Sequence, residues 1–472
     1  MGLLQVHSFV AGQWAAPCGD AVPLYNAFTG ALIGHAGAGA PDVAAMYEHA
    51  LATGGPALRA MTFHDRARML KALAQYLSAR KNELYELSYL TGATKSDSWI
   101  DIDGGIGTTF VFASKGRREM PDAHVYLDGD VEMLSRRGSF VGQHVCTPLQ
   151  GVAVHINAFN FPVWGMLEKL APTLLAGMPA IVKPATATGY LTEAAFRMII
   201  ESDLLPHGAV QLVSGPLGPL LDRLGPQDAV SFTGSAATGV MLRGTPNLLE
   251  RSVRFSAEQD SLNATILGPD VMVGDPEFDL FIKEAAGEIT AKAGQKCTAV
   301  RRILVPEALR VPVAEALQAA LGDVAIGDPR LKEVGMGALA SGGQKQDVLA
   351  KCEMFKGEAR CIIGGEAPRL TGEDLAGGAF VAPTIFDCAD PDGATHLHEQ
   401  EAFGPVACLM AYRELGHAAV LANRGGGALV TSVVTRDREV AHSLVAASAS
   451  HHGRLYFNNR DSMAEATGHG AP

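Results

Sequence analysis

The chain has 472 residues and a formal net charge of −12 at neutral pH, and it contains no long run of basic residues. This acidic balance argues against nucleic acid or an anionic membrane as the main partner. Hydrophobic residues make up 47% of the sequence and charged residues 19%, which excludes a disordered chain and fits a folded protein. The length is sufficient for two or three domains.

The cysteines and the N-terminus bear on the compartment. Seven cysteines are widely scattered and form no CxxC pair, and an odd number without disulfide or zinc spacing favours a reducing compartment. The segment Met1–His7 lacks the charged start and apolar core of a signal peptide. No uncharged apolar run approaches about 18 residues elsewhere. We therefore expect a cytoplasmic protein without membrane segments.

The N-terminal part of the chain is predicted to hold short strands followed by helices. Residues 6–36 combine strand-forming stretches with turns. The clearest helix begins at Thr62, whose hydroxyl can cap it, with Asp65 three residues later. Its buried face is predicted from apolar residues at helical spacing, namely Met69, Leu70, Leu73, Ala74 and Leu77.

Residues 124–146 change to an extended character, with polar and apolar residues mixed. The strand-like stretches His124–Leu127 and Ser139–Val141 predict a long hairpin that reaches a partner subunit.

From Val152 to Phe255 strands and helices alternate. Strands are expected at 152–156, 180–182, 209–213, 229–232 and 252–255, and helices at 163–176 and 192–201. This order predicts a parallel sheet with helices on both faces and a ligand at the carboxyl ends of the strands. A second alternating region follows from about 258 to 456, and residues 458–472 are small and polar.

Cys297 lies on a turn between a helix-like run, Phe278–Lys292, and a strand-like run, Arg301–Val305. Gly294 gives this turn its conformational freedom. Taken alone, a cysteine is more often a small buried hydrophobe than a nucleophile. Other parts of the chain must therefore decide whether Cys297 is reactive.

Three further sites could carry chemistry, although each also has a plain structural explanation. Gly234 and Ser235 follow a strand and open a helix, where free N–H groups attract phosphate, but a segment with two glycines can also be a simple turn. Asn160 precedes Pro162, which fits the first turn of the next helix, so the amide could hold an oxyanion or merely cap that helix. Glu258 alone would be a surface carboxylate.

His396, His398 and Glu399 could suggest a metal site. No further ligand cluster supports one, so a solvated loop is favoured and no metal is expected.

Six motifs occur in the order that characterises one enzyme family. They are Asn160-Phe161-Pro162, Lys183-Pro184-Ala185, Phe232-Thr233-Gly234-Ser235, Glu258, Gly294-Gln295-Lys296-Cys297 and Glu401-Ala402-Phe403-Gly404-Pro405. Over nearly its whole length the chain resembles the aldehyde dehydrogenase superfamily. The resemblance implies an α/β fold with two doubly wound domains plus an oligomerisation hairpin.

The resemblance also implies a domain organisation. Residues 1–123 and 147–257 would form the dinucleotide-binding domain, 124–146 the oligomerisation hairpin and 258–456 the catalytic domain. Residues 457–472 would start an incomplete C-terminal arm, and a homo-oligomer is expected if that arm is complete.

The catalytic roles follow by matching motif. Cys297 would attack an aldehyde to give a thiohemiacetal, which loses hydride to the nicotinamide and becomes a thioester. A free cysteine has a pKa of about 8.5, and lowering it to about 7 requires roughly 2 kcal/mol of stabilisation. Asn160 and the N–H of Cys297 would hold the oxyanion. Glu258 would activate the water that releases the acid, and Lys169 would support this base.

The resemblance assigns the cofactor to a second set of residues. Gly234 and Ser235 would contact the pyrophosphate, and Lys183 the adenosine ribose. Glu401 would contact the nicotinamide ribose, and Phe403 would pack beside the nicotinamide ring. Phe159 would be a further cofactor contact.

Thr186 decides the expected cofactor. NAD-preferring relatives usually have a glutamate at this position, which clasps the ribose hydroxyls and would repel a 2′-phosphate. A hydroxyl beside Lys183 can bind that phosphate, so we predict NADP over NAD, with NAD as the alternative.

Finer features resemble the branch that acts on CoA-linked semialdehydes. They are residues 101–105, 156–162, 260–263 and 467–470. Within it, the resemblance implies the aldehyde dehydrogenase part of the bifunctional ring-opening proteins of phenylacetate degradation, with 3-oxo-5,6-dehydrosuberyl-CoA semialdehyde as substrate. The alternative is the 3,4-dehydroadipyl-CoA semialdehyde dehydrogenase type of benzoate degradation. Gln259–Ser261 stand where most of the superfamily has Gly-Gly-Lys, a departure that suits this branch.

Two rival functions differ in mechanism or class. An acylating enzyme would pass the thioester to CoA, but such relatives generally lack a base at the position of Glu258. A catalytically inactive fold would act as a binding or structural protein, against which the joint presence of Cys297, Glu258 and Asn160 argues.

Overall fold

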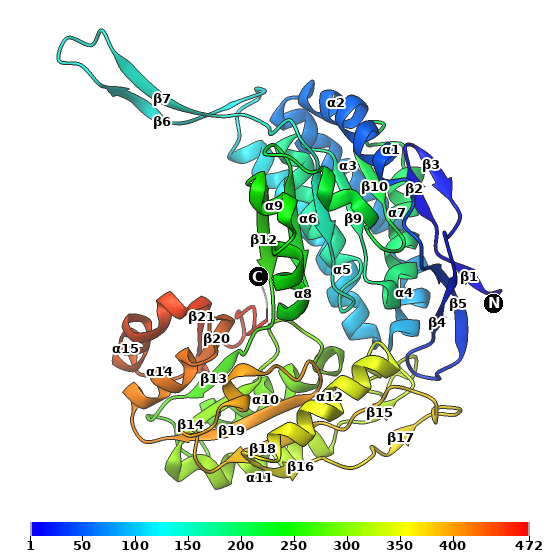
Figure 1. Cartoon of the computed structure of the whole chain (residues 1–472). Coiled ribbons are helices and arrows are strands. Elements are labelled where there is room, and N and C mark those ends of the chain that lie inside the picture. Colours follow the sequence, from blue (N-terminus) through cyan, green and yellow to red (C-terminus); the bar gives the residue numbers. More distant parts are fainter. Residues whose placement is uncertain (1, 471–472) are drawn as a thin grey trace. The chain divides into compact units, whose positions relative to one another are not determined.

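The computed structural model describes residues 2–470, and the chain divides into two compact units (Figure 1). Unit 1 comprises Met1–Tyr25, Leu32–Ser88 and Ser98–Gln259, and unit 2 comprises Asn26–Ala31, Tyr89–Asp97 and Asp260–Pro472. Two short N-terminal segments thus belong to unit 2, although the sequence patterns place them with the dinucleotide-binding domain. The reason is packing, because Phe28 is buried in the core of unit 2 and the Ala379 N–H donates to the Ala27 carbonyl at 2.8 Å.

Unit 1 is built on a seven-stranded sheet with the order β12-β11-β8-β9-β10-β2-β3. The five strands from β12 to β10 pair in parallel, whereas β2 and β3 add an antiparallel edge. Their bounds are β2 Ser8–Val10, β3 Gln13–Ala15, β8 Ala153–Ile156, β9 Ala180–Lys183, β10 Val210–Leu212, β11 Ala229–Thr233 and β12 Arg254–Glu258. The predicted parallel β-α-β sheet is confirmed. Strand β8 lies between β9 and β11, so the chain order reverses there and creates a switch point for a ligand.

The helices of unit 1 connect these strands or precede them. They are α1 Val43–His49, α2 Gly55–Arg59, α3 Phe63–Arg80, α4 Asn82–Ser88, α5 Lys95–Arg118, α6 Trp164–Ala176, α7 Gly189–Glu201, α8 Ala236–Arg243 and α9 Pro246–Glu250, with the first residues of α5 counted in unit 2. Thr62 and Asp65 form the predicted capping box at the start of α3. A small sheet of β1 Leu4–Gln5, β5 Leu32–Gly37 and β4 Ala21–Tyr25 completes this unit.

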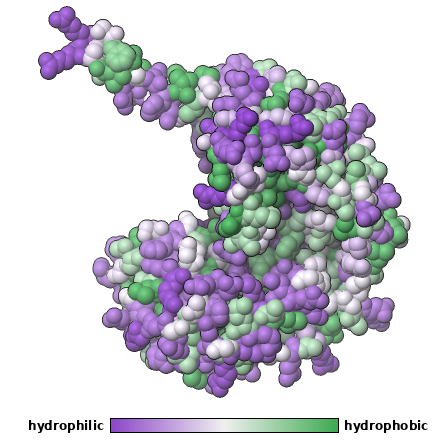
Figure 2. Space-filling view, viewed as in Figure 1, coloured by the Kyte–Doolittle hydropathy of each residue, from purple (hydrophilic) through white to green (hydrophobic). Residues whose placement is uncertain are grey.

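The predicted hairpin is present as β6 Tyr126–Met133 and β7 Val141–Cys146, which pair antiparallel. It projects from unit 1, and Figure 2 shows hydrophobic side chains along it. Met133 and Phe140 are each 63% exposed. Exposed apolar side chains on a projecting element are typical of a surface that another chain covers.

Unit 2 is built on a second seven-stranded sheet with the order β16-β18-β19-β14-β13-β20-β21. All neighbours pair in parallel except β16 and β18. The strands are β13 Ala264–Leu267, β14 Arg302–Pro306, β16 Arg360–Ile363, β18 Thr384–Cys388, β19 Val406–Tyr412, β20 Ala428–Val434 and β21 His452–Asn458. A separate pair consists of β15 Ile326–Gly327 and β17 Leu370–Thr371.

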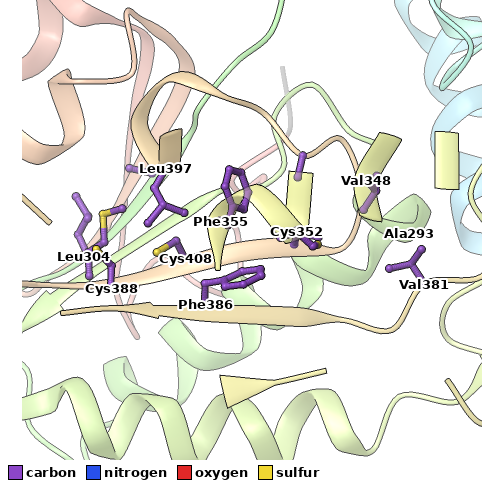
Figure 3. Close-up of a cluster of buried hydrophobic side chains, with 14 of the residues drawn as sticks. Ala293, Leu304, Val348, Cys352, Phe355, Val381, Phe386, Cys388, Leu397 and Cys408 are labelled. Atoms are coloured by element: carbon purple, nitrogen blue, oxygen red, sulfur yellow. The ribbon is translucent and has the colours of Figure 1, made fainter. Parts of the chain in front are cut away.

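The helices of unit 2 cover a large apolar core. They are α10 Pro276–Thr290, α11 Arg310–Gly322, α12 Gly342–Phe355, α13 His396–Glu399, α14 Leu415–Asn423 and α15 Arg438–Ser448. Figure 3 shows part of this core, where Phe355 and Phe386 meet edge to face with ring centroids 5.7 Å apart. Ala293, four residues before the predicted nucleophile, belongs to the same cluster. The turn that carries Cys297 is therefore anchored in the core of unit 2.

Several local predictions need correction. The predicted helix Phe278–Lys292 ends at Thr290, because Lys292 and Ala293 have positive φ. Pro162 precedes α6 instead of entering its first turn, since the helix begins at Trp164.

The prediction of a solvated loop at His396–Glu399 is wrong, because these residues form helix α13 and the His398 ring is buried. Its Nδ1 accepts from Arg302 Nη1 at 3.2 Å, and its Nε2 donates to the Pro391 carbonyl at 3.0 Å. Among residues 2–470, no helix combines the length and apolar character needed to cross a membrane.

Candidate active site

The turn before Cys297 has an unusual backbone. Lys292, Ala293 and Gly294 follow one another with φ values of 53°, 51° and 70°. The left-handed region costs a residue with a side chain roughly 1–2 kcal/mol. Two contacts offset this cost, because the Lys292 N–H donates to Asp97 Oδ1 at 2.6 Å and its ammonium donates to Thr91 Oγ1 at 3.0 Å.

Gly294 is required by space as well as by φ. A Cβ at this position would lie 2.1 Å from the Gly404 carbonyl oxygen, closer than any real contact. The next residue, Gln295, is fully buried and links the turn to its surroundings. Its Oε1 accepts from the Ala340 N–H at 2.9 Å, and its Nε2 donates to the Lys292 carbonyl at 2.9 Å. Gly294 and Gln295 therefore fix the backbone conformation of the turn before Cys297.

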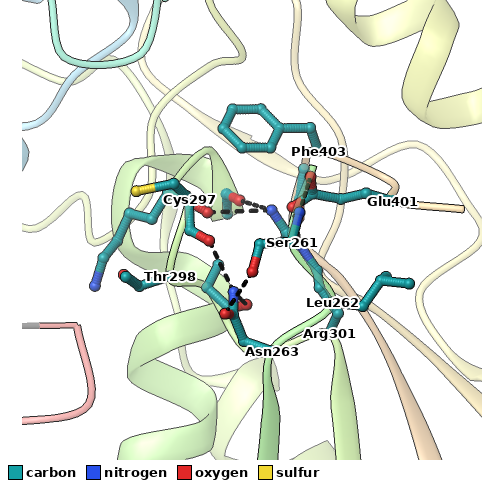
Figure 4. Close-up of polar contacts among 12 residues, drawn as sticks. Ser261, Leu262, Asn263, Cys297, Thr298, Arg301, Glu401 and Phe403 are labelled. Carbon is teal, nitrogen blue, oxygen red and sulfur yellow. Dashed lines mark hydrogen bonds and ion pairs between the residues drawn. The ribbon is translucent and has the colours of Figure 1, made fainter. Parts of the chain in front are cut away.

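Side-chain donors hold the backbone around the thiol. Asn263 Nδ2 donates to the carbonyls of Cys297 at 2.8 Å and Ala299 at 3.0 Å. Arg301 Nη2 donates to the carbonyls of Gly294 at 2.9 Å and Lys296 at 3.3 Å. In Figure 4 the Cys297 thiol points away from this network, while its carbonyl faces Asn263. The network therefore fixes the main chain around Cys297.

Glu401 is tied to the same network. Its Oε1 accepts from Arg301 Nε at 3.0 Å and its Oε2 from the Ser261 N–H at 3.2 Å (Figure 4). Burial raises the pKa of Glu401, and the Arg301 charge and the Ser261 N–H oppose that rise. Both side chains are almost fully buried and each carboxylate oxygen accepts from a donor, so Glu401 and Arg301 form a buried ion pair. The Arg301 guanidinium also lies over the Phe403 ring, 5.4 Å from its centroid.

The site residues of unit 2 precede strands instead of following them. Ser261 and Asn263 come before β13, Cys297 before β14, and Glu401 and Phe403 before β19. Because these three strands are adjacent and parallel, their amino ends meet at one edge of the sheet. That edge joins residues 260–263 to the Cys297 turn and to the Glu401 motif.

The site residues of unit 1 follow strands, as the sequence predicts. Phe159 and Asn160 follow β8, Lys183 ends β9, Ser235 follows β11 and Glu258 ends β12. Glu258 was expected after a strand at 252–255, but the strand extends through it, because the Gly234 N–H donates to the Glu258 carbonyl at 3.1 Å. Parallel strands place all of these residues at the carboxyl edge, where open α/β sheets bind ligands.

The donors at this edge fit a dinucleotide phosphate. Ser235 caps α8, its Oγ accepting from the Thr238 N–H at 3.3 Å, and the helix start presents further N–H groups. A Cβ on Gly239, in the first turn of α8, would lie 2.3 Å from the Gln259 amide, so glycine lets that loop lie against the helix.

Lys183 and Asn157 support the same fit. The ammonium of Lys183 donates to the Pro184 carbonyl at 2.9 Å, and burial lowers its pKa. Asn157, beside it at the end of β8, is only 5% exposed, and neither polar atom of its amide has a hydrogen-bond partner among the described residues. Buried polar groups normally have hydrogen-bond partners, so a bound ligand or water would supply the partners of this amide. The chemistry at this edge therefore fits the phosphate and other polar groups of a dinucleotide.

Thr186 and Lys169 occupy the remaining predicted positions. Thr186 begins a short 3-10 helix, Thr186–Thr188, directly after the Lys183 strand, and its side chain is half-buried. Lys169 lies on α6, where its ammonium donates to Glu168 Oε1 at 2.9 Å and to the Gly165 carbonyl at 3.3 Å. Near Phe159, the Thr188 hydroxyl donates to the Phe159 carbonyl at 3.0 Å.

Sequence reasoning missed Arg301, Asp97 and the supporting role of Asn263. Asn263 belongs to residues 260–263, which the sequence marks only as a branch feature. Arg301 looks like the first residue of an ordinary strand, and Asp97 is 195 residues from its partner Lys292. No local pattern signals such contacts.

Comparison with known proteins identifies the family of the chain. The chain matches the family model described as "Aldehyde dehydrogenase family" over residues 14–470. It is 40% identical over 469 residues to the 3,4-dehydroadipyl-CoA semialdehyde dehydrogenase of Aromatoleum evansii, covering 99% of this chain and 91% of the relative. It is 30% identical over 404 residues to 1-pyrroline-5-carboxylate dehydrogenase 2 of Halalkalibacterium halodurans, covering 84% and 73%.

Solved structures share the fold. HpcC from Thermus thermophilus has a TM-score of 0.85 and 23% identity, covering 96% of this chain and 85% of that one. Betaine aldehyde dehydrogenase of Staphylococcus aureus in complex with NAD+ has a TM-score of 0.83 and 23% identity, covering 96% and 87%. The family model spans almost the whole sequence, and the relative from Aromatoleum evansii aligns over nearly all of it. The chain therefore belongs to the aldehyde dehydrogenase family.

Proposed function

We propose that this enzyme oxidises a CoA-linked semialdehyde to its acid, with NADP as cofactor and Cys297 as nucleophile. The main observation behind this proposal is that side chains hydrogen-bond to the backbone of the turn that contains Cys297. Asn263 and Arg301 donate hydrogen bonds to four backbone carbonyls around Cys297. Arg301 also forms the ion pair with Glu401. Such a preorganised main chain supports covalent catalysis, because a fixed nucleophile needs little reorganisation in the transition state.

The proposed steps use the residues that the sequence motifs assign. Cys297 Sγ attacks the aldehyde carbon and forms a thiohemiacetal, while Asn160 and the Cys297 N–H donate to the developing oxyanion. The bound nicotinamide supplies a hydride acceptor. Loss of hydride leaves a thioester on Cys297. Glu258 then takes a proton from water, the hydroxide attacks the thioester carbon, and the sulfur departs as the acid forms.

Residues at the carboxyl edge of the unit 1 sheet would hold the cofactor. Ser235 and the N–H groups at the start of α8 would bind the pyrophosphate, and Lys183 the adenosine ribose. Glu401 and Phe403 would hold the nicotinamide ribose and ring, with Phe159 as a further contact. The choice of NADP is supported by Thr186, a hydroxyl close in sequence to Lys183 where a carboxylate would repel a 2′-phosphate.

The substrate proposal is supported by the relative from Aromatoleum evansii, whose name specifies a 3,4-dehydroadipyl-CoA semialdehyde. This favours the benzoate-type semialdehyde as the substrate. The phenylacetate-type substrate, 3-oxo-5,6-dehydrosuberyl-CoA semialdehyde, is the second candidate, supported by the sequence features of the CoA-semialdehyde branch.

Kinetics with a panel of aldehydes tests this proposal. Each chain length is offered with and without its CoA thioester, using NADP and then NAD, in the absence of free CoA. We expect kcat/KM to be higher for the CoA-linked members and reduced cofactor to form without a thiol acceptor. Comparable kcat/KM for simple aldehydes would remove the CoA-linked substrate, and a strict need for free CoA would indicate the acylating enzyme instead.

The inactive alternative is tested with a single variant. The wild-type protein should give a burst of reduced cofactor that Cys297→Ala lacks, because the thiohemiacetal cannot form. If neither protein produces reduced cofactor from any aldehyde of the panel, the chain is a binding or structural protein.

We also propose that the enzyme is cytoplasmic and forms a homo-oligomer through the β6–β7 hairpin. The first point is supported by seven cysteines that are all free thiols. The second is supported by the exposed apolar side chains of the hairpin, including Leu127, Leu134 and Phe140.

A further inference from the structure

The segment after β21, residues 459–470 (called the tail below), lies against the Cys297 turn. We propose that His469 in this tail is a positioning residue, which holds the main chain at Thr298 and thereby the nucleophile. The proposal rests on the proposed role of Cys297 and adds a residue that the catalytic motifs do not contain.

The tail is fastened to unit 2 by its own contacts. The Arg454 guanidinium donates to the His469 carbonyl, and the Gly468 N–H donates to the Tyr456 hydroxyl oxygen at 3.2 Å. Arg454 and Tyr456 lie on β21, at the edge of the sheet. His469 is only 2% exposed, so the tail buries its ring instead of leaving it in solvent.

His469 donates to one of three successive backbone carbonyls that each accept a hydrogen bond from a side chain. Its Nε2 lies 2.8 Å from the Thr298 carbonyl oxygen. Asn263 holds the carbonyls of the residues on either side, Cys297 and Ala299. Three successive carbonyls therefore each accept from a side chain. The donor for the outer two lies beside β13, and the donor for the middle one comes from the tail.

The geometry also fixes the tautomer of His469. Because a carbonyl oxygen only accepts, Nε2 carries the proton. Nδ1 is buried and has no hydrogen-bond partner among residues 2–470, so the neutral ring is the form that fits. Burial lowers the pKa of His469 to about 4, and the nearby Lys296 and Arg454 charges act in the same direction while Glu288 opposes them. His469 therefore remains a neutral donor throughout the range in which a dehydrogenase works.

Gly470 brings the tail close to the turn. A Cβ at this position would lie 2.6 Å from Lys296 Nζ and 2.7 Å from Thr298 Oγ1. The tail thus contacts the residues on both sides of Cys297. A shift of the Thr298 carbonyl would move the main chain next to Cys297 and with it the thiol. Misplacement of a reacting group by about 1 Å can cost on the order of a hundredfold in rate.

The test compares three variants of the full chain. His469→Ala removes the donor, His469→Gln restores an amide N–H near the position of Nε2, and His451→Ala changes an exposed histidine of the same unit. The readouts are kcat and KM for the best aldehyde of the panel, and hydrogen exchange of the peptide covering residues 292–300. Thermal midpoints report any general loss of folding.

We expect His469→Ala to lower kcat by roughly tenfold to a hundredfold with KM changed by less than about twofold. Exchange should rise in residues 292–300, and His469→Gln should recover part of both effects, while His451→Ala should match the wild type. The ratio of wild-type to variant kcat should stay constant from about pH 6 to pH 9, because a neutral donor does not titrate there.

Unchanged kcat in His469→Ala would overturn the proposal. Equal losses in the alanine and glutamine variants, with a lower thermal midpoint and faster exchange throughout unit 2, would show a general structural role and would also overturn it. If the wild type oxidises no aldehyde, the proposed function fails. In that case the exchange of residues 292–300 still decides whether His469 holds the turn.

Discussion

Asn263 donates from one amide nitrogen to the carbonyls of both Cys297 and Ala299, at 2.8 and 3.0 Å. Its Oδ1 accepts from the Ser261 hydroxyl at 2.7 Å and from the Val430 N–H at 3.1 Å, and the side chain is fully buried. One residue therefore ties the Cys297 turn to two strands of the unit 2 sheet.

Replacing Asn263 by alanine should lower both stability and activity. Two carbonyls beside Cys297 lose their donor, and a buried group without a partner costs about 1–3 kcal/mol. The matched control is Asn247→Ala, because Asn247 Nδ2 also donates to two carbonyls, those of Leu221 and Leu224, in unit 1. Chemical denaturation should show a loss in both variants, whereas kcat should fall only in Asn263→Ala. Equal kcat losses would mean that destabilisation alone explains the effect.

Thr186→Glu should shift the cofactor preference from NADP toward NAD. A carboxylate at this position can accept from the ribose hydroxyls and repels a 2′-phosphate. Thr186→Ser is the control, since it keeps a hydroxyl and adds no charge. The measurement is the ratio of kcat/KM for the two cofactors at fixed aldehyde. An unchanged ratio in Thr186→Glu would contradict the assignment of this position.

Glu258→Gln should separate the two halves of the reaction. Without a base, the thioester still forms, but its hydrolysis should slow by about 10²–10⁴-fold. Rapid mixing should show a burst of about one reduced cofactor per active site followed by slow turnover. The exposed Glu250→Gln, on α9, should behave as the wild type. Loss of the burst itself would place Glu258 in the first half of the reaction.

Gly294→Ala should be strongly destabilising, because the new Cβ meets the Gly404 carbonyl and φ is +70°. Gly287→Ala is the control within the preceding helix, where an added Cβ has nothing within 4 Å. There, alanine should be neutral or stabilise by up to about 1 kcal/mol. Thermal unfolding is the measurement. The midpoint should fall in Gly294→Ala and should stay the same or rise in Gly287→Ala.

Stability should fall as the pH drops from about 6.5 toward 4, in part through His398. Burial, followed by the Arg302 charge, lowers the pKa of His398 to about 4. A depressed histidine pKa means that the unfolded chain binds the proton first, so stability is complete above about 6.5 and is lost as the pH falls through the folded value. One such proton contributes at most about 1.4 kcal/mol per pH unit. His398→Gln should have a shallower slope of unfolding free energy against pH, and a slope parallel to the wild type would exclude His398 as the cause.

Much of the fold was predictable because its signals are local. Alternating strands and helices predict the parallel sheet of unit 1, and the capping box at Thr62 marks the start of α3. The hairpin at 124–146 was also predictable from its extended, mixed character. The helix end at Thr290 was not predictable, because Lys292 and Ala293 have ordinary helix-forming side chains. Lys292 is held in its positive φ by Asp97 and Thr91, which are far away in the sequence.

The sequence by itself determined the family of the protein and the residues on which the proposed chemistry rests, since Cys297, Glu258, Asn160 and Glu401 stand in recognisable motifs. The tertiary structure alone decided how the turn that carries Cys297 is held. Asn263, Arg301 and His469 come from three separate parts of the chain and meet at the carbonyls of one turn. The physical reason is that a carbonyl accepts a hydrogen bond from any donor that folding brings within reach, and its own residue type does not specify which one.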